Sequence, residues 1–319
     1  ESADTDYIAH SLLEFRFPDL LWLIEPDIET FDLVLESMEG IRKLASVPAL
    51  SSDQQRANQT ESAGFQLSSN ARESRLLENG IAYLRPGPFY NYTDPDRTWD
   101  NSSFITFIDD AFESFLSAGS DTLVIDLRQN PGGDNSFSDH MVSWIADEPF
   151  VFASEFLIRS SDEAEAANQA RLDGNPGAAE GVSGLFAKEY KSTPRGETFS
   201  FKLPPAQPRT GVKFEGDVFV LINRHSYSQA VNVAATFQDY GWGTIVGEPT
   251  SDFATTYGSI ETFTLPNTGL TVNFPKAHII RPSGDRVPGG VVPDIEIASP
   301  IVPVKEDVVL DELISRIAD

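Results

Sequence analysis

Two short, almost wholly apolar runs stand out near the middle of the chain, Thr122–Leu127 and Val218–Ile222. A brief run without polar alternation is typical of a strand that is buried on both faces. Apolar positions at helical spacing follow each run, over Ser138–Ala146 and from Ser228 to Tyr240. Because buried strands alternate with helices, the pattern predicts an α/β core.

The same patterns predict further elements. Helical spacing covers Ser103–Ala118, and the remaining strand-like runs are Gly80–Arg85, Thr244–Val246, Ile260–Leu265, Leu270–Phe274 and His278–Ile280. Near the N-terminus, apolar residues recur at helical spacing from Ile8 to Phe15 and again from Phe31 to Met38. We therefore expect this part of the chain to be helical.

Shifts in composition divide the chain. The polar stretch 51–75 predicts a linker or loop. We expect a helical N-terminal segment with this linker over 1–75, the α/β core over 76–305 and a C-terminal helix over 306–319. Within the core, 150–208 is rich in Gly, Pro and charge, and the pattern predicts an exposed helix at Ser160–Arg171, so we interpret this segment as an insert or lid.

Charge narrows the classes of partner. The 319 residues include 23 Lys and Arg against 49 Asp and Glu, a formal net charge of −26. Such a surface repels nucleic acid and anionic membranes, and no apolar run reaches the ~18 residues that span a bilayer. The absence of cysteine excludes disulfides and thiolate chemistry. The pattern does not indicate an oligomeric state.

The first candidate for chemistry is the turn Asn130-Pro131-Gly132-Gly133, at the end of the first buried strand. Ligands of α/β sheets collect at the carboxyl ends of strands. Adjacent glycines let backbone amides approach a substrate closely, and two such amides can form an oxyanion hole. Taken alone, the same residues are also an ordinary Pro-Gly-Gly turn.

The second candidate follows the other buried strand. Ser226 and Gln229 fit an S-x-x-Q capping box, which predicts that Ser226 caps the next helix. Ser228 would then lie in the first helical turn, where the helix dipole favours negative charge. A serine there can attack a carbonyl carbon while the Gln229 amide holds the developing oxyanion. An ordinary first-turn serine is the alternative.

The two turns together form a compound pattern: IDLRQNPGG, then VFVLINRHSYSQAVNVAATFQDYG, VGEPT and a late GGVVPDIEI. This pattern resembles the C-terminal processing (tail-specific) serine peptidases, the family that also holds the tricorn core and the interphotoreceptor retinoid-binding protein. The resemblance implies a ClpP/crotonase-like ββα-spiral core. It further implies Ser228 as nucleophile and an oxyanion hole from the Gly132-Gly133 turn and Gln229.

The sequence also departs from that family. Its processing peptidases carry a lysine base in a GEPTxGKG stretch, and Phe253 stands at that place here. The tricorn branch instead uses an upstream histidine and a glutamate shortly before the PD motif, where this chain has Asp285. The residues before the core do not resemble the family's PDZ domain.

The general base is therefore sought among the histidines, whose pKa suits the role. His225 is nearest to Ser228 in sequence, His140 follows the Gly-Gly turn, and His10 lies in the N-terminal segment where the tricorn branch keeps its histidine. The alternative for each is a packing or solvated residue. Glu248 and Tyr257 are candidates to orient the base. The spacing predicts no metal site and no cofactor.

Three functions remain open at this stage. The first is a serine peptidase that cleaves peptides or proteins through an acyl-enzyme on Ser228 with a non-lysine base. The second is an inactive, peptidase-like module that binds a peptide or an apolar ligand. The third, crotonase-type acyl-CoA chemistry, gives Ser228 no role and needs a basic patch. Family habit leads us to expect a periplasmic or secreted protein.

Overall fold

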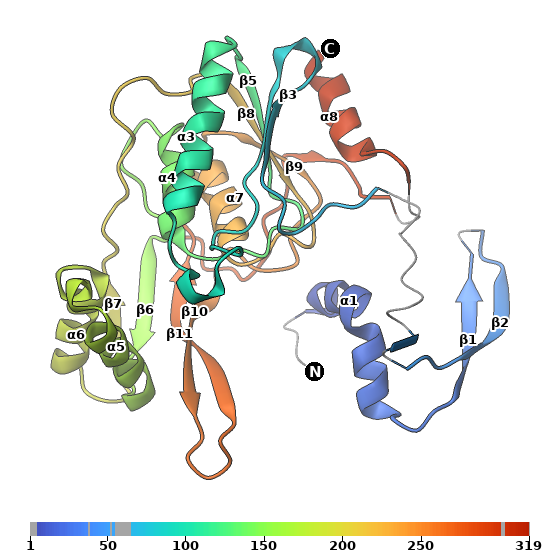
Figure 1. The fold of residues 1–319 in the computed structure, drawn as a ribbon, viewed down its shortest axis with the longest axis horizontal. Coiled ribbons are helices and arrows are strands. Elements are labelled where there is room, and N and C mark those ends of the chain that lie inside the picture. The colour runs from blue at the N-terminus through green and yellow to red at the C-terminus, as the bar shows by residue number, and fades with distance from the viewer. Residues whose placement is uncertain (1–4, 38, 52, 55–64, 301–303, 319) are drawn as a thin grey trace. The chain divides into compact units, whose positions relative to one another are not determined.

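The computed structural model describes residues 5–37, 39–51, 53–54, 65–300 and 304–318. The chain divides into two units (Figure 1). One holds Glu1–Gln66 and Pro300–Asp311, and the other, the core unit, holds Leu67–Ser299 and Glu312–Asp319. The division after Gln66 lies nine residues before the expected end of the N-terminal segment. None of the described helices has the length and apolar character needed to cross a membrane.

The N-terminal unit is only partly helical. Helix α1 (Asp6–Ile24) begins after Thr5, whose side chain accepts a hydrogen bond from the Ile8 amide at 3.2 Å. The next element is an antiparallel hairpin of β1 (Thr30–Glu36) and β2 (Arg42–Pro48). The prediction of a helix from Phe31 onward was therefore wrong, and Met38 lies outside the described residues. The alternate apolar residues in 31–35 are also compatible with a strand. Pairing with β2 stabilises the strand in place of a helix.

A six-stranded sheet forms the centre of the core unit, in the order β12-β9-β8-β5-β4-β3. Its strands are β3 (Glu73–Leu76), β4 (Ala82–Arg85), β5 (Thr122–Asp126), β8 (Asp217–Ile222), β9 (Thr244–Gly247) and β12 (Ile295–Glu296). All neighbours pair in parallel except β3, which is antiparallel to β4. Strand β3 begins inside the stretch predicted to be a polar linker.

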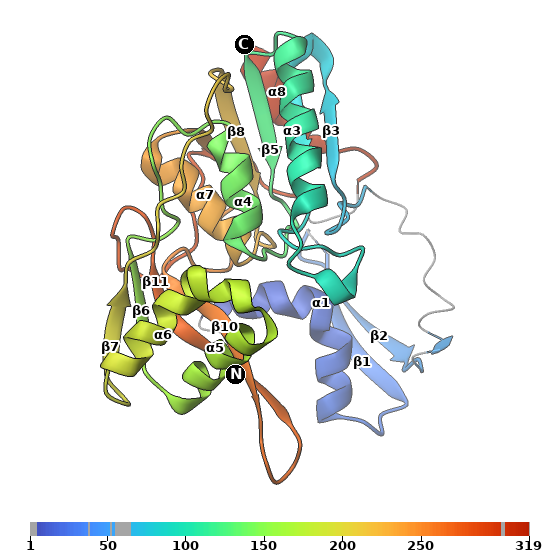
Figure 2. The same cartoon turned by 60° about the vertical axis from the view of Figure 1, so that its left-hand side comes forward.

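Three helices pack side by side on one face of this sheet (Figures 1 and 2): α3 (Ser102–Ser117), α4 (Asn135–Ser143) and α7 (Gln229–Tyr240). The main core lies between them and the sheet. Its aromatic centre includes Phe112, stacked on Trp144 with ring centroids 5.0 Å apart. Both strands that the apolar runs predicted, β5 and β8, lie in the middle of the sheet, which explains why they lack polar alternation.

A second, antiparallel sheet has the order β10-β11-β6-β7. It is built from β6 (Glu155–Arg159), β7 (Thr198–Phe201), β10 (Thr256–Thr264) and β11 (Thr271–Ile280). Helices α5 (Asp162–Gly174) and α6 (Val182–Ser192) belong to the same region, and Phe186 of α6 packs on Phe201 with centroids 4.3 Å apart. The segment 150–208 thus supplies half of this sheet and its core. The runs predicted at Leu270–Phe274 and His278–Ile280 are one strand, β11.

The part of the chain that the structure describes also holds three 3-10 helices and a C-terminal helix. These are η1 (Glu78–Gly80), η2 (Pro95–Arg97), η3 (Pro176–Glu180) and α8 (Val308–Ala318). Helix α8 falls within the segment 306–319 for which a helix was predicted.

Candidate active site

The two candidate turns leave the same edge of the central sheet. Strands β5 and β8 are parallel neighbours with Asp126 opposite Leu221, so their carboxyl ends are adjacent. The turns are also joined directly, because the Tyr227 amide donates to the Asn130 carbonyl at 2.9 Å. The sequence prediction that the Gly-Gly turn and Ser228 converge is consistent with this geometry.

Ser228 occupies a sharp turn between β8 and α7. Helix α7 begins at Gln229, and Ser228 is the residue before it, with φ 53° and ψ −119°. These angles match the first central position of a type II′ turn, and the Ala230 amide closes that turn on the Tyr227 carbonyl at 3.0 Å. A positive φ is uncommon outside glycine and is often concentrated at functional sites. A strained strand-to-helix turn exposes the serine hydroxyl in α/β hydrolases.

The predicted capping box is wrong. The Ser226 hydroxyl is buried, donates to the Leu127 carbonyl at 2.8 Å and accepts from the Asn223 amide at 3.0 Å. The Gln229 side chain donates to the Ser138 hydroxyl at 2.9 Å and does not reach back to Ser226. Ser226 therefore ties the turn to β5. Ser228 is exposed, and its hydroxyl has no hydrogen-bond partner among the residues that the structure describes.

Glycine is required at both positions of the Gly-Gly turn. A β-carbon on Gly132 (φ +86°) would lie 2.6 Å from the Tyr227 carbonyl oxygen, and one on Gly133 (φ +140°) would lie 2.1 Å from the Phe89 carbonyl oxygen. The Phe89 amide donates to the Gly132 carbonyl at 2.9 Å, which holds the turn in place. The Gly132 backbone therefore lies directly against the Ser228 turn.

The backbone amides of the predicted oxyanion hole differ in whether they already donate a hydrogen bond. The Gly132 amide donates to Asn130 Oδ1 at 2.9 Å, so it is already engaged. Within the described part of the chain, the amides of Gly133 and Gln229 have no acceptor. The Gln229 amide also lies at the N-terminus of α7, where the helix dipole favours an anion. These two amides are the better candidates to hold an oxyanion.

A buried ionic cluster supports this edge. The carboxylate of Asp126 lies 2.7 Å from Arg128 Nη2 and 3.2 Å from Arg85 Nη1, and it accepts from the Tyr83 hydroxyl at 2.7 Å. Burial alone would raise the pKa of Asp126, but the charge and hydrogen bonds of Arg128, together with the charge of Arg85, lower it. Burial and the neighbouring carboxylate raise the pKa of Tyr83. The sequence analysis did not predict this cluster, although the charged residues at the end of the apolar strand, Asp126 and Arg128, were a signal for it.

The side chain of Asp252 contacts Ser228 directly. Its Oδ2 accepts from the Ser228 amide at 2.6 Å, and its Oδ1 accepts from the Phe253 amide at 2.9 Å. Sequence analysis assigned no role to Asp252. The available signal was its place in the stretch that carries the family's lysine, directly before Phe253, whose side chain is half-buried.

The three candidate bases are placed differently. His225 belongs to the Ser228 turn itself, is half-buried, and donates its backbone amide to Asn223 Oδ1 at 3.1 Å. His140 Nε2 lies 2.6 Å from Asp109 Oδ1 of α3. His140 is two residues beyond Ser138, which contacts Gln229 of α7, so it occupies a different face of α4. His10 belongs to α1 in the N-terminal unit.

The two supporting candidates have other partners. Glu248 accepts from Arg224 at 2.8 Å and from the Ser299 amide at 2.8 Å, so it holds loops together. Tyr257 is exposed and stacks on His278, with ring centroids 4.6 Å apart. No group of three or more His, Asp or Glu side chains among the described residues could hold a metal ion.

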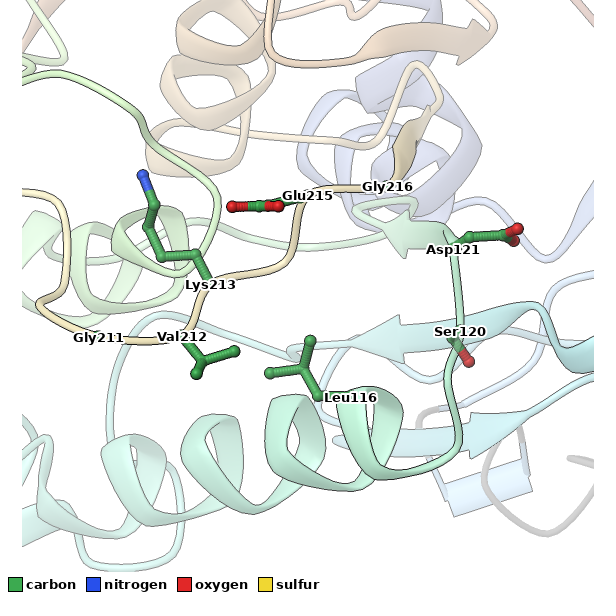
Figure 3. A pocket seen from close by; sticks show the side chains of 8 residues that line it. All are labelled: Leu116, Ser120, Asp121, Gly211, Val212, Lys213, Glu215 and Gly216. Atoms are coloured by element: carbon green, nitrogen blue, oxygen red, sulfur yellow. The ribbon is translucent and has the colours of Figure 1, made fainter.

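A pocket of about 680 Å³ lies at the other edge of the central sheet (Figure 3). It is lined by Leu116, Ser120, Asp121, Gly211, Val212, Lys213, Glu215 and Gly216. Asp121 and Gly216 directly precede β5 and β8, whereas the candidate turns follow these strands. The pocket is therefore separate from the candidate active site.

The chain is similar in sequence and in fold to known proteins. A profile of peptidase family S41 matches residues 98–297, more than half of the chain. No curated protein sequence matches this chain. The solved structure of mature CPAF gives a TM-score of 0.58 at 15% identity, covering 91% of this chain and 67% of that chain. A putative peptidase from Parabacteroides merdae ATCC 43184 gives 0.53 at 15% identity, covering 100% and 90%. These likenesses confirm the predicted α/β fold with a ClpP/crotonase-like core.

Proposed function

The chain belongs to peptidase family S41, and on that premise we propose that it cleaves peptide bonds through an acyl-enzyme formed on Ser228. Membership of a serine peptidase family implies a peptide or protein substrate. The observation that carries the proposal for Ser228 is its backbone conformation, with φ 53° and ψ −119° immediately before α7. This conformation exposes the hydroxyl beside the free amide of Gln229.

The proposed reaction uses the two turns together. Ser228 Oγ attacks the scissile carbonyl carbon and gives its proton to a general base, while the amides of Gly133 and Gln229 bind the oxyanion. The C–N bond then breaks, and the amine leaves with the proton from the base. Water attacks the acyl-enzyme, again with help from the base, and releases the acid product and Ser228.

The base in this proposal is not a lysine. Phe253 stands where the resemblance expects that residue, and a phenyl ring cannot accept a proton. We propose a histidine in its place, and His225 is the first to test because it shares the turn with Ser228. His140 and His10 are the alternatives, although His140 is engaged by Asp109.

Covalent labelling tests the nucleophile. The intact protein, Ser228→Ala and Ser136→Ala are exposed to a fluorophosphonate probe, and the labelled peptide is found by mass spectrometry. Ser136 is an exposed serine near the start of α4, so its replacement should disturb the fold less than replacement of the buried Ser226 would. We expect labelling at Ser228 in the intact protein and in Ser136→Ala, and none in Ser228→Ala. A folded intact protein that does not label would contradict the proposal.

A second candidate function is a binding module without catalysis. Phe253 favours it, together with a Ser228 hydroxyl that has no hydrogen-bond partner among the described residues. It predicts that the protein binds peptides with the same affinity in the intact form and in Ser228→Ala, without labelling and without cleavage. Isothermal titration with a peptide library, beside the labelling experiment, separates the two functions.

A further inference from the structure

We infer that Asp252 is a positioning residue for the nucleophile: its carboxylate holds the Ser228 backbone in the conformation that presents the hydroxyl. The bond from the Ser228 amide to Asp252 Oδ2 is 2.6 Å long, and its acceptor is a carboxylate on a loop 24 residues further along the chain. This inference rests on the proposed function of Ser228.

The bond acts on the strained part of the turn. Ser228 has a positive φ, which an isolated serine rarely adopts, so the surrounding structure must hold it. A hydrogen bond to a charged acceptor is stronger than one to a neutral acceptor. The carboxylate also lies next to the first residue of α7, where the helix dipole favours a negative charge. Both effects favour an aspartate at this place.

The loop that carries Asp252 is itself anchored. Thr250 exchanges two hydrogen bonds with Val291, one from the Thr250 amide to the Val291 carbonyl at 3.1 Å and one from the Val291 amide to Thr250 Oγ1 at 2.9 Å. Ser251 Oγ donates to the Arg224 carbonyl at 2.5 Å, and Thr250 and Ser251 are both buried. Asp252 is therefore presented to the Ser228 turn from a fixed backbone, as a positioning residue requires.

The contacts of Asp252 separate this role from that of a general base. Both of its carboxylate oxygens accept backbone amides, from Ser228 and from Phe253. The hydrogen bond from Ser228 to this carboxylate comes from its backbone amide. A base must lie within hydrogen-bond reach of the proton that it abstracts. The geometry thus assigns the carboxylate to the amide of the nucleophile and leaves its hydroxyl to another group.

Two substitutions test the inference against a matched control. Asp252→Asn keeps an oxygen that can accept from the Ser228 amide, whereas Asp252→Ala removes it. Asp294→Ala is the control, because Asp294 Oδ2 accepts the Ile245 amide at 2.8 Å, at the amino end of β9 and away from Ser228. Each variant is examined at a temperature where circular dichroism shows it to be folded.

Two measurements are made on each protein: the rate of fluorophosphonate labelling and the hydrogen exchange of the backbone segment that contains Ser228. We expect Asp252→Ala to slow labelling by roughly 10–100-fold and to speed hydrogen exchange at Ser228. Asp252→Asn should slow labelling by less than about 3-fold, since the acceptor is kept. Asp294→Ala should match the intact protein in both measurements at this segment.

Two results would overturn the inference. One is an Asp252→Ala variant with unchanged exchange at Ser228. The other is an Asp252→Asn variant that labels as slowly as Asp252→Ala while its exchange stays normal, which is the behaviour of a lost base. If the intact protein does not label at all, the proposed function fails, and hydrogen exchange alone still tests whether Asp252 holds the turn.

Discussion

A β-carbon on Gly132 would lie 2.7 Å from the amide nitrogen of Gln229, so the two turns meet with no space for a side chain between them. Gly132 follows β5 and Gln229 begins α7, so the contact joins two segments that are distant in sequence. The spacing of the proposed oxyanion amides therefore depends on this single glycine position.

We predict that Gly132→Ala lowers the labelling rate of Ser228 by about 10²-fold or more, because displacement of an oxyanion donor has an effect of that size. The control is Gly284→Ala. Gly284 has φ +82°, close to the +86° of Gly132, but its added β-carbon would meet nothing within 4 Å. Backbone strain should destabilise both variants, whereas only Gly132→Ala also collides with the Ser228 turn, so only Gly132→Ala should lose reactivity. Equal labelling rates in the two variants would contradict the proposed oxyanion hole.

Removal of one partner from the buried ionic cluster should destabilise the core unit strongly. We expect Arg128→Met to lower the free energy of unfolding by about 3–5 kcal/mol, because the buried carboxylate of Asp126 loses its main partner. The matched control is Arg97→Met, which removes an exposed arginine that pairs with Asp94 and should change stability little. Urea denaturation measures both. A small effect of Arg128→Met would show that Arg85 and Tyr83 suffice to hold the carboxylate.

The pH dependence of stability should report on Asp139 of α4. Burial, opposed by a hydrogen bond from Asn135 and reinforced by the charge of Asp134, raises the pKa of Asp139 from 3.8 to about 7. The folded state therefore binds this proton more tightly than the unfolded state. The stability that Asp139 contributes is fully present below pH 3.8 and is lost as pH rises through about 7.

Asp139→Asn should remove this dependence, since an amide does not titrate. At pH 8 we expect the variant to be more stable than the intact protein by about 1–2 kcal/mol, and near pH 4 the two should differ little. Urea denaturation at several pH values gives the comparison. The same stability difference at both pH values would rule out titration of Asp139 as its cause.

Single histidine substitutions should identify the base. We expect His225→Ala to slow acylation by about 10²-fold or more, as loss of a general base does. His140→Ala should instead reduce stability, because it breaks the contact with Asp109, and it should leave the labelling rate nearly unchanged. His10→Ala is measured in the same series. If none of the three slows labelling about 10²-fold, the proposal of a histidine base is wrong.

The central strands could be predicted because burial on both faces leaves a local signature. The apolar run Val218–Ile222 corresponds to β8 (Asp217–Ile222) almost residue for residue. By contrast, β6 and β7 are stabilised by pairing with β11 and with each other, and β11 lies far away in sequence. A composition rich in Gly, Pro and charge hid these strands, because the partner that orders them is not visible locally.

In the candidate site, too, features with a local sequence signature could be predicted and features that depend on distant partners could not. Ser228 and Gly132-Gly133 could be selected as candidates from the sequence because the chemistry needs particular residue types at the ends of strands. The helix start was misplaced because Ser226 and Gln229 satisfy the capping pattern, while the tertiary bond to Leu127 takes the Ser226 hydroxyl. The contact between Asp252 and Ser228 was missed because it depends on two loops meeting in space, for which no sequence spacing is diagnostic.

The backbone of Ser228 also limits which amino acids evolution can place there. Threonine carries the same hydroxyl, but its branched β-carbon fits poorly where φ is positive. Cysteine has an unbranched side chain and meets no such obstacle. Exchange between serine and cysteine is therefore sterically open at this position and exchange with threonine is closed, so the stereochemistry of the main chain selects among nucleophiles before their reactivity does.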